Sequence, residues 1–190
     1  FSVAYDNGVF VSASAGNSGP TADTVAHRGP WTMTVGASTH DRGFVADITL
    51  ESGGNSVTLD GVSITAGYGP APVVLAADFD GLDDTDPEKG MCNQPFPAGT
   101  FDGEIVVCKR GVIARVTKSF NVAQGGAGGF VLYNPSLNSL AADSHWVPGI
   151  HIQDDAGVAL LDFLANNSDV MGTLSGGVKA TVQGDVMAAF

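Results

Sequence analysis

The chain has 190 residues, of which 44% are hydrophobic and 15% are charged, so the composition predicts a mostly folded chain with one hydrophobic core and part of a second. The formal net charge of −12 argues against nucleic acid and anionic membrane surfaces as partners, because both are polyanionic. No run of about 18 apolar residues occurs, so the sequence predicts no membrane-spanning segment.

Two apolar runs near the start of the chain predict strands. The first covers residues 9–14 and leads into a glycine turn, and the second covers residues 31–37. Both are apolar enough for central strands of a parallel sheet, whose two faces are normally covered by helices. Phe1 opens a stretch without the basic n-region of a signal peptide, so we expect the chain to be a fragment of a longer protein.

From about residue 50 onward, the pattern predicts strands that alternate with helices. Asp60-Gly61 lies between two alternating runs and predicts a hairpin turn. Apolar residues at helical spacing predict a helix over 113–123 and a second one that Asp154 or Asp155 caps, with Val158, Leu161 and Leu164 on one face. Further strands are expected at 72–76, 103–108, 130–133, 147–152, 170–174 and 178–182. These elements predict a compact, β-rich α/β or α+β unit.

An acidic segment offers the one candidate ion site. Calcium prefers hard oxygen ligands, and glycine allows a sharp turn between them. A solvated acidic loop is the default interpretation, because the spacing and the final Glu of an EF-hand are absent. Calcium is the alternative, with these candidate ligands: Asp78, Asp80, Asp83, Asp84 and Asp86.

Cys92 and Cys108 frame a loop rich in Pro and Gly. Metal binding is disfavoured because C-x₂-C spacing is absent and no His lies close in the sequence. We therefore predict a disulfide, typical of a secreted protein, with free thiols as the alternative.

Other polar residues receive structural interpretations. His145 and His151 make a poor metal pair because no third ligand is evident. Asn166 begins a glycosylation sequon that marks a surface site in a suitable host. The basic cluster is expected to solvate one helix face: Lys109, Arg110, Arg115 and Lys118.

Residues 11–20 and 31–39 resemble the subtilase segment that ends in the oxyanion-hole asparagine, followed by the next core strand. The resemblance implies that Asn17 is an oxyanion donor in a parent enzyme, since an amide can donate to the developing oxyanion without a change of charge. The alternative is that Asn17 only makes a turn.

A second resemblance covers roughly residues 50–182. Residues 103–111, 123–134 and 147–152 resemble, in that order, the strand and helix-to-strand motifs of a protease-associated (PA) domain. This implies a compact PA-like sheet or barrel with about two helices. It divides the chain into a subtilase fragment at 1–45, a PA domain at 46–183 and a return segment at 184–190. The cysteine pair resembles that of plant-type subtilases with this insert.

The resemblances imply a non-catalytic PA domain of a secreted subtilisin-like serine endopeptidase, which modulates substrate access or binding, or self-association. Implied partners are the catalytic domain of the same polypeptide, protein or peptide substrates, and a second copy of the chain. A hydrolase is disfavoured because the segments that would carry the Ser-His-Asp triad are not found. A free-standing PA-type interaction module is the other alternative, which the subtilase-like strands at the start disfavour.

Overall fold

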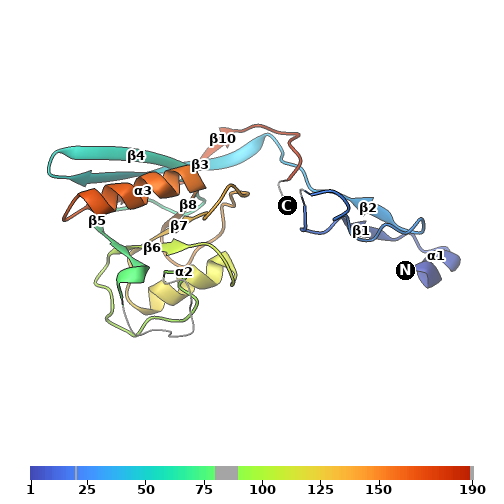
Figure 1. Cartoon of the computed structure of the whole chain (residues 1–190), viewed down its shortest axis with the longest axis horizontal. Helices are drawn as coiled ribbons and strands as arrows, with labels where there is room; N and C mark the ends of the chain where they lie inside the picture. The colour runs from blue at the N-terminus through green and yellow to red at the C-terminus, as the bar shows by residue number, and fades with distance from the viewer. Residues whose placement is uncertain (20, 80–89, 189–190) are drawn as a thin grey trace. The chain divides into compact units, whose positions relative to one another are not determined.

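The computed structural model describes residues 1–19, 21–79 and 90–188. The chain divides into two compact units (Figure 1). We call Phe44–Ala180 the core unit, and Phe1–Gly43 together with Thr181–Phe190 the terminal unit. The sequence patterns predicted these boundaries at 45/46 and 183/184. None of the helices in the described ranges is long and apolar enough to cross a bilayer.

The described part of the core unit is dominated by a sheet that closes on itself. Around the barrel, the strands follow the order β3 (Arg42–Ser52), β4 (Asn55–Val62), β8 (Gly149–Ile152), β7 (Gly129–Tyr133), β6 (Ile105–Lys109), β5 (Tyr68–Leu75) and β9 (Met171–Leu174). Antiparallel pairing of β9 with β3 closes the ring, and β10 (Val178–Thr181) lies beside β3. The strands β5, β6, β7 and β8 are mutually parallel. The sequence therefore predicted the sheet or barrel correctly.

The predicted hairpin at Asp60-Gly61 is wrong. The turn lies at Gly53 and Gly54, between β3 and β4, and both glycines have positive φ angles of 55° and 90°. Gly61 instead lies inside β4, where a Cβ atom would come within 2.6 Å of the backbone oxygen of His151. A glycine is needed there because β8 approaches closely. Glycine also favours turns, so the Asp-Gly pair could not distinguish a hairpin turn from this close contact between strands.

Alternate residues of the parallel strands face two different hydrophobic clusters. Ile105 and Val107 of β6 belong to the inner cluster, which also contains Leu160 of α3 (Asp154–Asn166). Val106 of β6 belongs to the outer cluster, which contains Val122 of α2 (Arg115–Gln124). Both faces of these strands are thus covered, as expected for parallel strands.

The two helices match the predicted faces only in part. The side chain of Gln153, not an Asp, caps α3 by accepting a hydrogen bond from the backbone N–H of Asp154. Of the predicted apolar face, Leu161 and Leu164 pack against the inner cluster, whereas Val158 is 60% exposed; Leu160 is fully buried. In α2, three of the buried residues are polar: Lys118, Ser119 and Asn121. Apolar spacing could not identify this polar face.

The terminal unit contains a short helix and a two-stranded sheet. The helix α1 spans Ser2–Asp6, and the parallel strands β1 and β2 span Ser12–Ser14 and Met33–Val35. The strands coincide with the two predicted apolar runs but are shorter, and α1 was not predicted. No described residue of this unit is buried.

Candidate functional site

Polar side chains gather where the parallel strands of the core unit end. Arg110 follows β6, Asn134 follows β7, and Gln153 follows β8. In sheets with parallel strands, ligands usually bind beyond the carboxyl ends of the strands. We call this region the carboxyl edge and define it as residues 110–114, residues 134–141 and Gln153.

Asn134, which is 1% exposed, organises the carboxyl edge. Its side-chain oxygen accepts hydrogen bonds from Nη1 of Arg110 at 3.0 Å and from Nε2 of His151 at 2.9 Å. Its Nδ2 donates to the side-chain oxygen of Gln153 at 2.7 Å and to the backbone oxygen of Asn138 at 3.3 Å. The amide of Asn134 therefore ties together the ends of three neighbouring strands.

Gln153 fixes the segment after β7 against the start of α3. Its Oε1 accepts from the backbone N–H groups of Asn138 at 3.2 Å and Asp154 at 3.3 Å. Its Nε2 donates to the backbone oxygen of Asn138 at 2.6 Å. One side chain thus caps the helix and holds the loop, so this part of the edge is preorganised.

His151 is held neutral beneath the edge. Its Nδ1 accepts from the backbone N–H of Ala141 at 3.1 Å, so Nε2 carries the proton that is donated to Asn134. Burial lowers the pKa of His151 to about 4, and the nearby charges of Arg110 and Arg115 contribute to this lowering. The Ala141 hydrogen bond and Asp143 oppose the shift only in part.

Ser119, His145 and Asp143 come together, but not as a catalytic triad. Nδ1 of His145 lies 3.1 Å from Oγ of Ser119, which donates to the backbone oxygen of Val116 and is fully buried. Asp143 is paired with Arg115 at 2.5 Å. Burial by itself raises the pKa of Asp143, but the hydrogen bond and charge of Arg115 outweigh it and lower the pKa. A buried Ser bonded to a backbone oxygen cannot reach a substrate.

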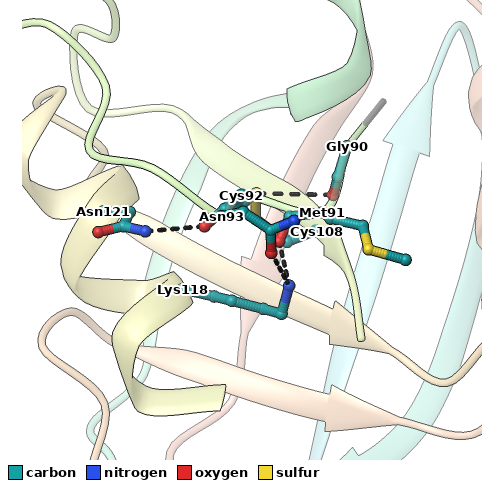
Figure 2. Close-up of a disulfide and its surroundings, with 7 residues drawn as sticks. All are labelled: Gly90, Met91, Cys92, Asn93, Cys108, Lys118 and Asn121. Carbon is teal, nitrogen blue, oxygen red and sulfur yellow. Dashed lines mark hydrogen bonds between the residues drawn. A yellow bond between two sulfur atoms is a disulfide. The ribbon is translucent and has the colours of Figure 1, made fainter. Parts of the chain in front are cut away.

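Cys92 and Cys108 form the predicted disulfide (Figure 2). Beside it, Nζ of Lys118 donates to the backbone oxygen of Met91 and, at 3.2 Å, to Oδ1 of Asn93. Lys118 is fully buried, so the expectation that the whole basic cluster is solvated is wrong. The cation instead anchors the segment around Cys92, and Asn121 donates a further hydrogen bond to the backbone oxygen of Cys92 at 2.9 Å.

The other predicted sites differ in how far the structure describes them. Asn17 lies just after β1 in the terminal unit and is exposed. Asp78 ends the short helix η1 (Ala76–Asp78), whereas Asp80, Asp83, Asp84 and Asp86 lie outside the described residues. Within the described ranges, to which His145 and His151 belong, no three His, Cys, Asp or Glu side chains are grouped to hold a metal ion.

Sequence reasoning did not identify the carboxyl edge as a site. Arg110 was assigned to a solvated cluster, Asn134 marked the end of a strand, and Gln153 received no role. A signal was available, because a polar residue follows each of three successive parallel strands. It becomes informative only once the strands are known to be neighbours in one sheet.

Comparison with known proteins shows a domain match within the chain and similarity over most of its length. Residues 70–160 match the PA domain model. The chain is 36% identical over 182 residues to subtilisin-like protease SBT5.4 of Arabidopsis thaliana, covering 89% of this chain and 22% of that protein. It is also 36% identical to subtilisin-like protease SBT1.5 of Arabidopsis thaliana, over 87% of this chain and 22% of that protein.

Among solved structures, the psychrophilic subtilisin-like protease Apa1 from Pseudoalteromonas sp. AS-11 aligns with a TM-score of 0.42 and 17% identity. The alignment covers 98% of this chain and 52% of that one. The chain spans about a fifth of the length of the curated relatives named above. Residues 70–160 are therefore a PA domain, within a chain that is homologous over most of its length to a segment of subtilisin-like proteases.

Proposed function

We propose that the chain is a non-catalytic segment of a secreted subtilisin-like serine endopeptidase, in which the PA domain binds parts of protein substrates and shapes their access to the catalytic cleft. The observation that carries this proposal is the similarity to subtilisin-like proteases over 89% of the chain, which takes in the terminal unit as well as the PA region. A free-standing PA module would not require the terminal unit. The disulfide supports secretion, because disulfides persist in oxidising compartments.

In this proposal, Asn17 of the terminal unit donates to the oxyanion of the whole protease. Its side chain is exposed and makes no hydrogen bond within the described residues, so the amide is available to a substrate. Gly16, which precedes it, has a φ angle of +87°, a conformation that favours glycine and that lets the backbone turn away from β1.

The carboxyl edge of the PA domain supplies the proposed contact with substrate. Val112 is 84% exposed and Leu137 is 75% exposed, so two apolar side chains of the carboxyl edge are open to solvent. Apolar side chains near a few fixed polar groups are typical of sites that bind ligands. An extended peptide could use both kinds of contact.

The role of Asn17 is tested in the whole protease with the substitution Asn17→Ala. We expect kcat to fall by about 10²–10³ with little change in KM, because the amide stabilises charge that develops only in the transition state. Ser18→Ala is the matched control, since Ser18 is the exposed neighbour and should retain full activity. An undiminished kcat for Asn17→Ala would contradict the assignment.

The role of the edge is tested with the double substitution Val112→Asp and Leu137→Asp in the same protease. We expect KM to rise several-fold for a folded protein substrate and to stay unchanged for a short chromogenic peptide that reaches only the catalytic cleft. Val178→Asp is the control, because Val178 is 59% exposed but lies on β10. Equal effects on both substrates would contradict a role in substrate access.

A further inference from the structure

Arg110 is a cation that lacks an acidic partner within the described residues. Its Nη1 is committed to Oδ1 of Asn134 and to the backbone oxygen of Ser139, at 3.0 and 2.7 Å. Its backbone N–H donates to the oxygen of Tyr133 at 2.9 Å. In the described ranges, Nε and Nη2 of Arg110 make no hydrogen bond, and no carboxylate lies within ion-pair distance of the guanidinium.

The uncommitted nitrogens of Arg110 reach solvent. The side chain is half-buried, and no buried side-chain nitrogen or oxygen in the described residues lacks a hydrogen-bond partner. Nε and Nη2 must therefore lie at the surface of the edge. The guanidinium is held by one corner and presents its other donors outward, an arrangement that suits bidentate recognition.

Among the residues that the structure describes, the charge balance around Arg110 is positive although the chain is acidic. Asp143, the acidic group that acts on Arg110, is already paired with Arg115 at 2.5 Å. Two guanidinium groups thus share one carboxylate, in a chain whose formal charge is −12. An anion beside Arg110 would balance this excess of positive charge.

The backbone next to Arg110 also has the features of a ligand site. Val112 has a φ angle of +60°, a conformation that is strained for a β-branched residue. Such outliers cluster at ligand-binding positions, where surrounding structure holds them. The strain keeps an exposed apolar side chain two residues away from the guanidinium.

Resting on the proposed function, we propose that Arg110 is the anchor of this edge and that it binds a carboxylate of an extended peptide. The two nitrogens pair with the two oxygens of the carboxylate, while Val112 and Leu137 contact neighbouring side chains of the peptide. The carboxylate comes either from an Asp or Glu side chain or from the C-terminus of the peptide, and both have the same planar chemistry.

Fluorescence anisotropy of the 190-residue chain with labelled heptapeptide libraries separates these sources. One library has a fixed central Glu and an amidated C-terminus, the second has a central Gln and a free C-terminus, and the third has a central Gln and an amidated C-terminus. We expect the first or the second library to bind about 10- to 100-fold more tightly than the third. Tight binding of the first alone identifies a side-chain carboxylate, and of the second alone a C-terminal one.

Arg110→Gln should abolish this preference, and Arg110→Lys should retain only part of it because an ammonium cannot pair in bidentate fashion. Lys179→Gln removes the same charge from an exposed position on β10 and should bind like the unmodified chain. If Arg110→Gln unfolds, the NMR resonance of the Nε–H group of Arg110 in the unmodified chain tests the proposal instead. This resonance should shift on addition of whichever of the first two libraries binds tightly, and should not shift on addition of the third library, which has no fixed carboxylate.

Two contrary outcomes are distinguishable. If all three libraries bind equally and Val112→Asp lowers their affinity, the edge binds peptides but the proposed role of Arg110 is wrong. If no library binds, both the peptide-binding role of the PA domain and the role of Arg110 are wrong. A loss of preference in Lys179→Gln equal to that in Arg110→Gln would also overturn the inference, because it would show only long-range charge attraction.

Discussion

The core unit and the terminal unit contain similarly apolar strands, but only the core unit encloses them. Phe130 of β7 is 0% exposed, whereas Phe10, which precedes β1, is 76% exposed. Trp31, which precedes β2, and Met33, its first residue, are 41% and 55% exposed. An apolar run therefore predicts a strand in both units, but it does not say whether the chain itself supplies what covers the strand.

The difference has a physical cause in the sheets. In the core unit, α2 and α3 pack on clusters that the two faces of the parallel strands form. In the terminal unit, β1 and β2 form a two-stranded parallel sheet, which is marginal in water unless helices or further strands cover it. We infer that the core unit carries the stability of the chain, and that the rest of the proposed protease covers β1 and β2.

The sharpest test replaces one Phe in each unit. Phe130→Ala should lower the free energy of unfolding by about 3–5 kcal/mol, because it empties a fully enclosed position in the outer cluster. Phe10→Ala should change it by no more than about 0.5 kcal/mol, as expected for an exposed position. Urea titrations followed by the fluorescence of Trp146, in a Trp31→Phe background, measure both values in the core unit.

The comparison fails if Phe10→Ala costs as much as Phe130→Ala. Such a result would mean that Phe10 is enclosed in solution, either by another part of the chain or by a second copy. Repeating the titration over a range of protein concentration separates these cases, because only enclosure by a second copy depends on concentration.

The disulfide strengthens only one of the two units. Its two cysteines, the only ones in the sequence, both lie in the core unit and are 16 residues apart. Replacing both by Ala should lower the free energy of unfolding by about 3 kcal/mol, because the denatured chain regains the freedom of that loop. Limited proteolysis should then show earlier cuts in the core unit and unchanged cutting before residue 44. Unchanged resistance of the core unit would contradict this division.

How much the sequence predicted depends on the kind of signal. Short apolar runs bounded by glycines gave the order of most strands of the core unit. They missed β3, in which Ala46, Ile48 and Leu50 alternate as buried residues. The alternation was present in the sequence, but the Asp-Gly pair in β4 led to a hairpin being predicted at the wrong position. A local turn signal and a close contact between strands both require glycine, so the sequence alone could not separate them.

Buried polar groups were the least predictable feature of the chain. Lys118 and His151 are both fully buried, and each is satisfied by partners that lie 10 or more residues away in the sequence. Helical or strand spacing reports on apolar faces, so it places such residues in solvent by default. The candidate site has the same origin, since Arg110, Asn134 and Gln153 meet only after β6, β7 and β8 have paired.

The histidines give the smallest of the expected effects on the free energy of unfolding, and their burial again differs between the two units. His27 and His40 of the terminal unit are exposed, whereas His151 of the core unit is fully buried. Because the pKa of His151 in the folded chain is about 4, below the ordinary imidazole value of 6.5, the unfolded chain binds more protons between these values. The contribution of neutral His151 to the free energy of unfolding is therefore fully present above pH 6.5 and is lost progressively as the pH decreases towards 4. Between pH 7.5 and pH 5 the loss should be about 2 kcal/mol.

His151→Gln tests this assignment, because Gln can still donate to Oδ1 of Asn134 but cannot titrate. The variant should start less stable at pH 7.5 and lose less stability on the way to pH 5, while His40→Gln should behave like the unmodified chain. His145, whose pKa is also lowered by burial, adds a loss of the same sign, so His145→Gln should flatten the curve further. Asp143, whose pKa lies below 3.8, does not contribute in this range. If His151→Gln loses as much stability as the unmodified chain between pH 7.5 and pH 5, the acid sensitivity comes from elsewhere, and the neutral His151 beneath the carboxyl edge is not its cause.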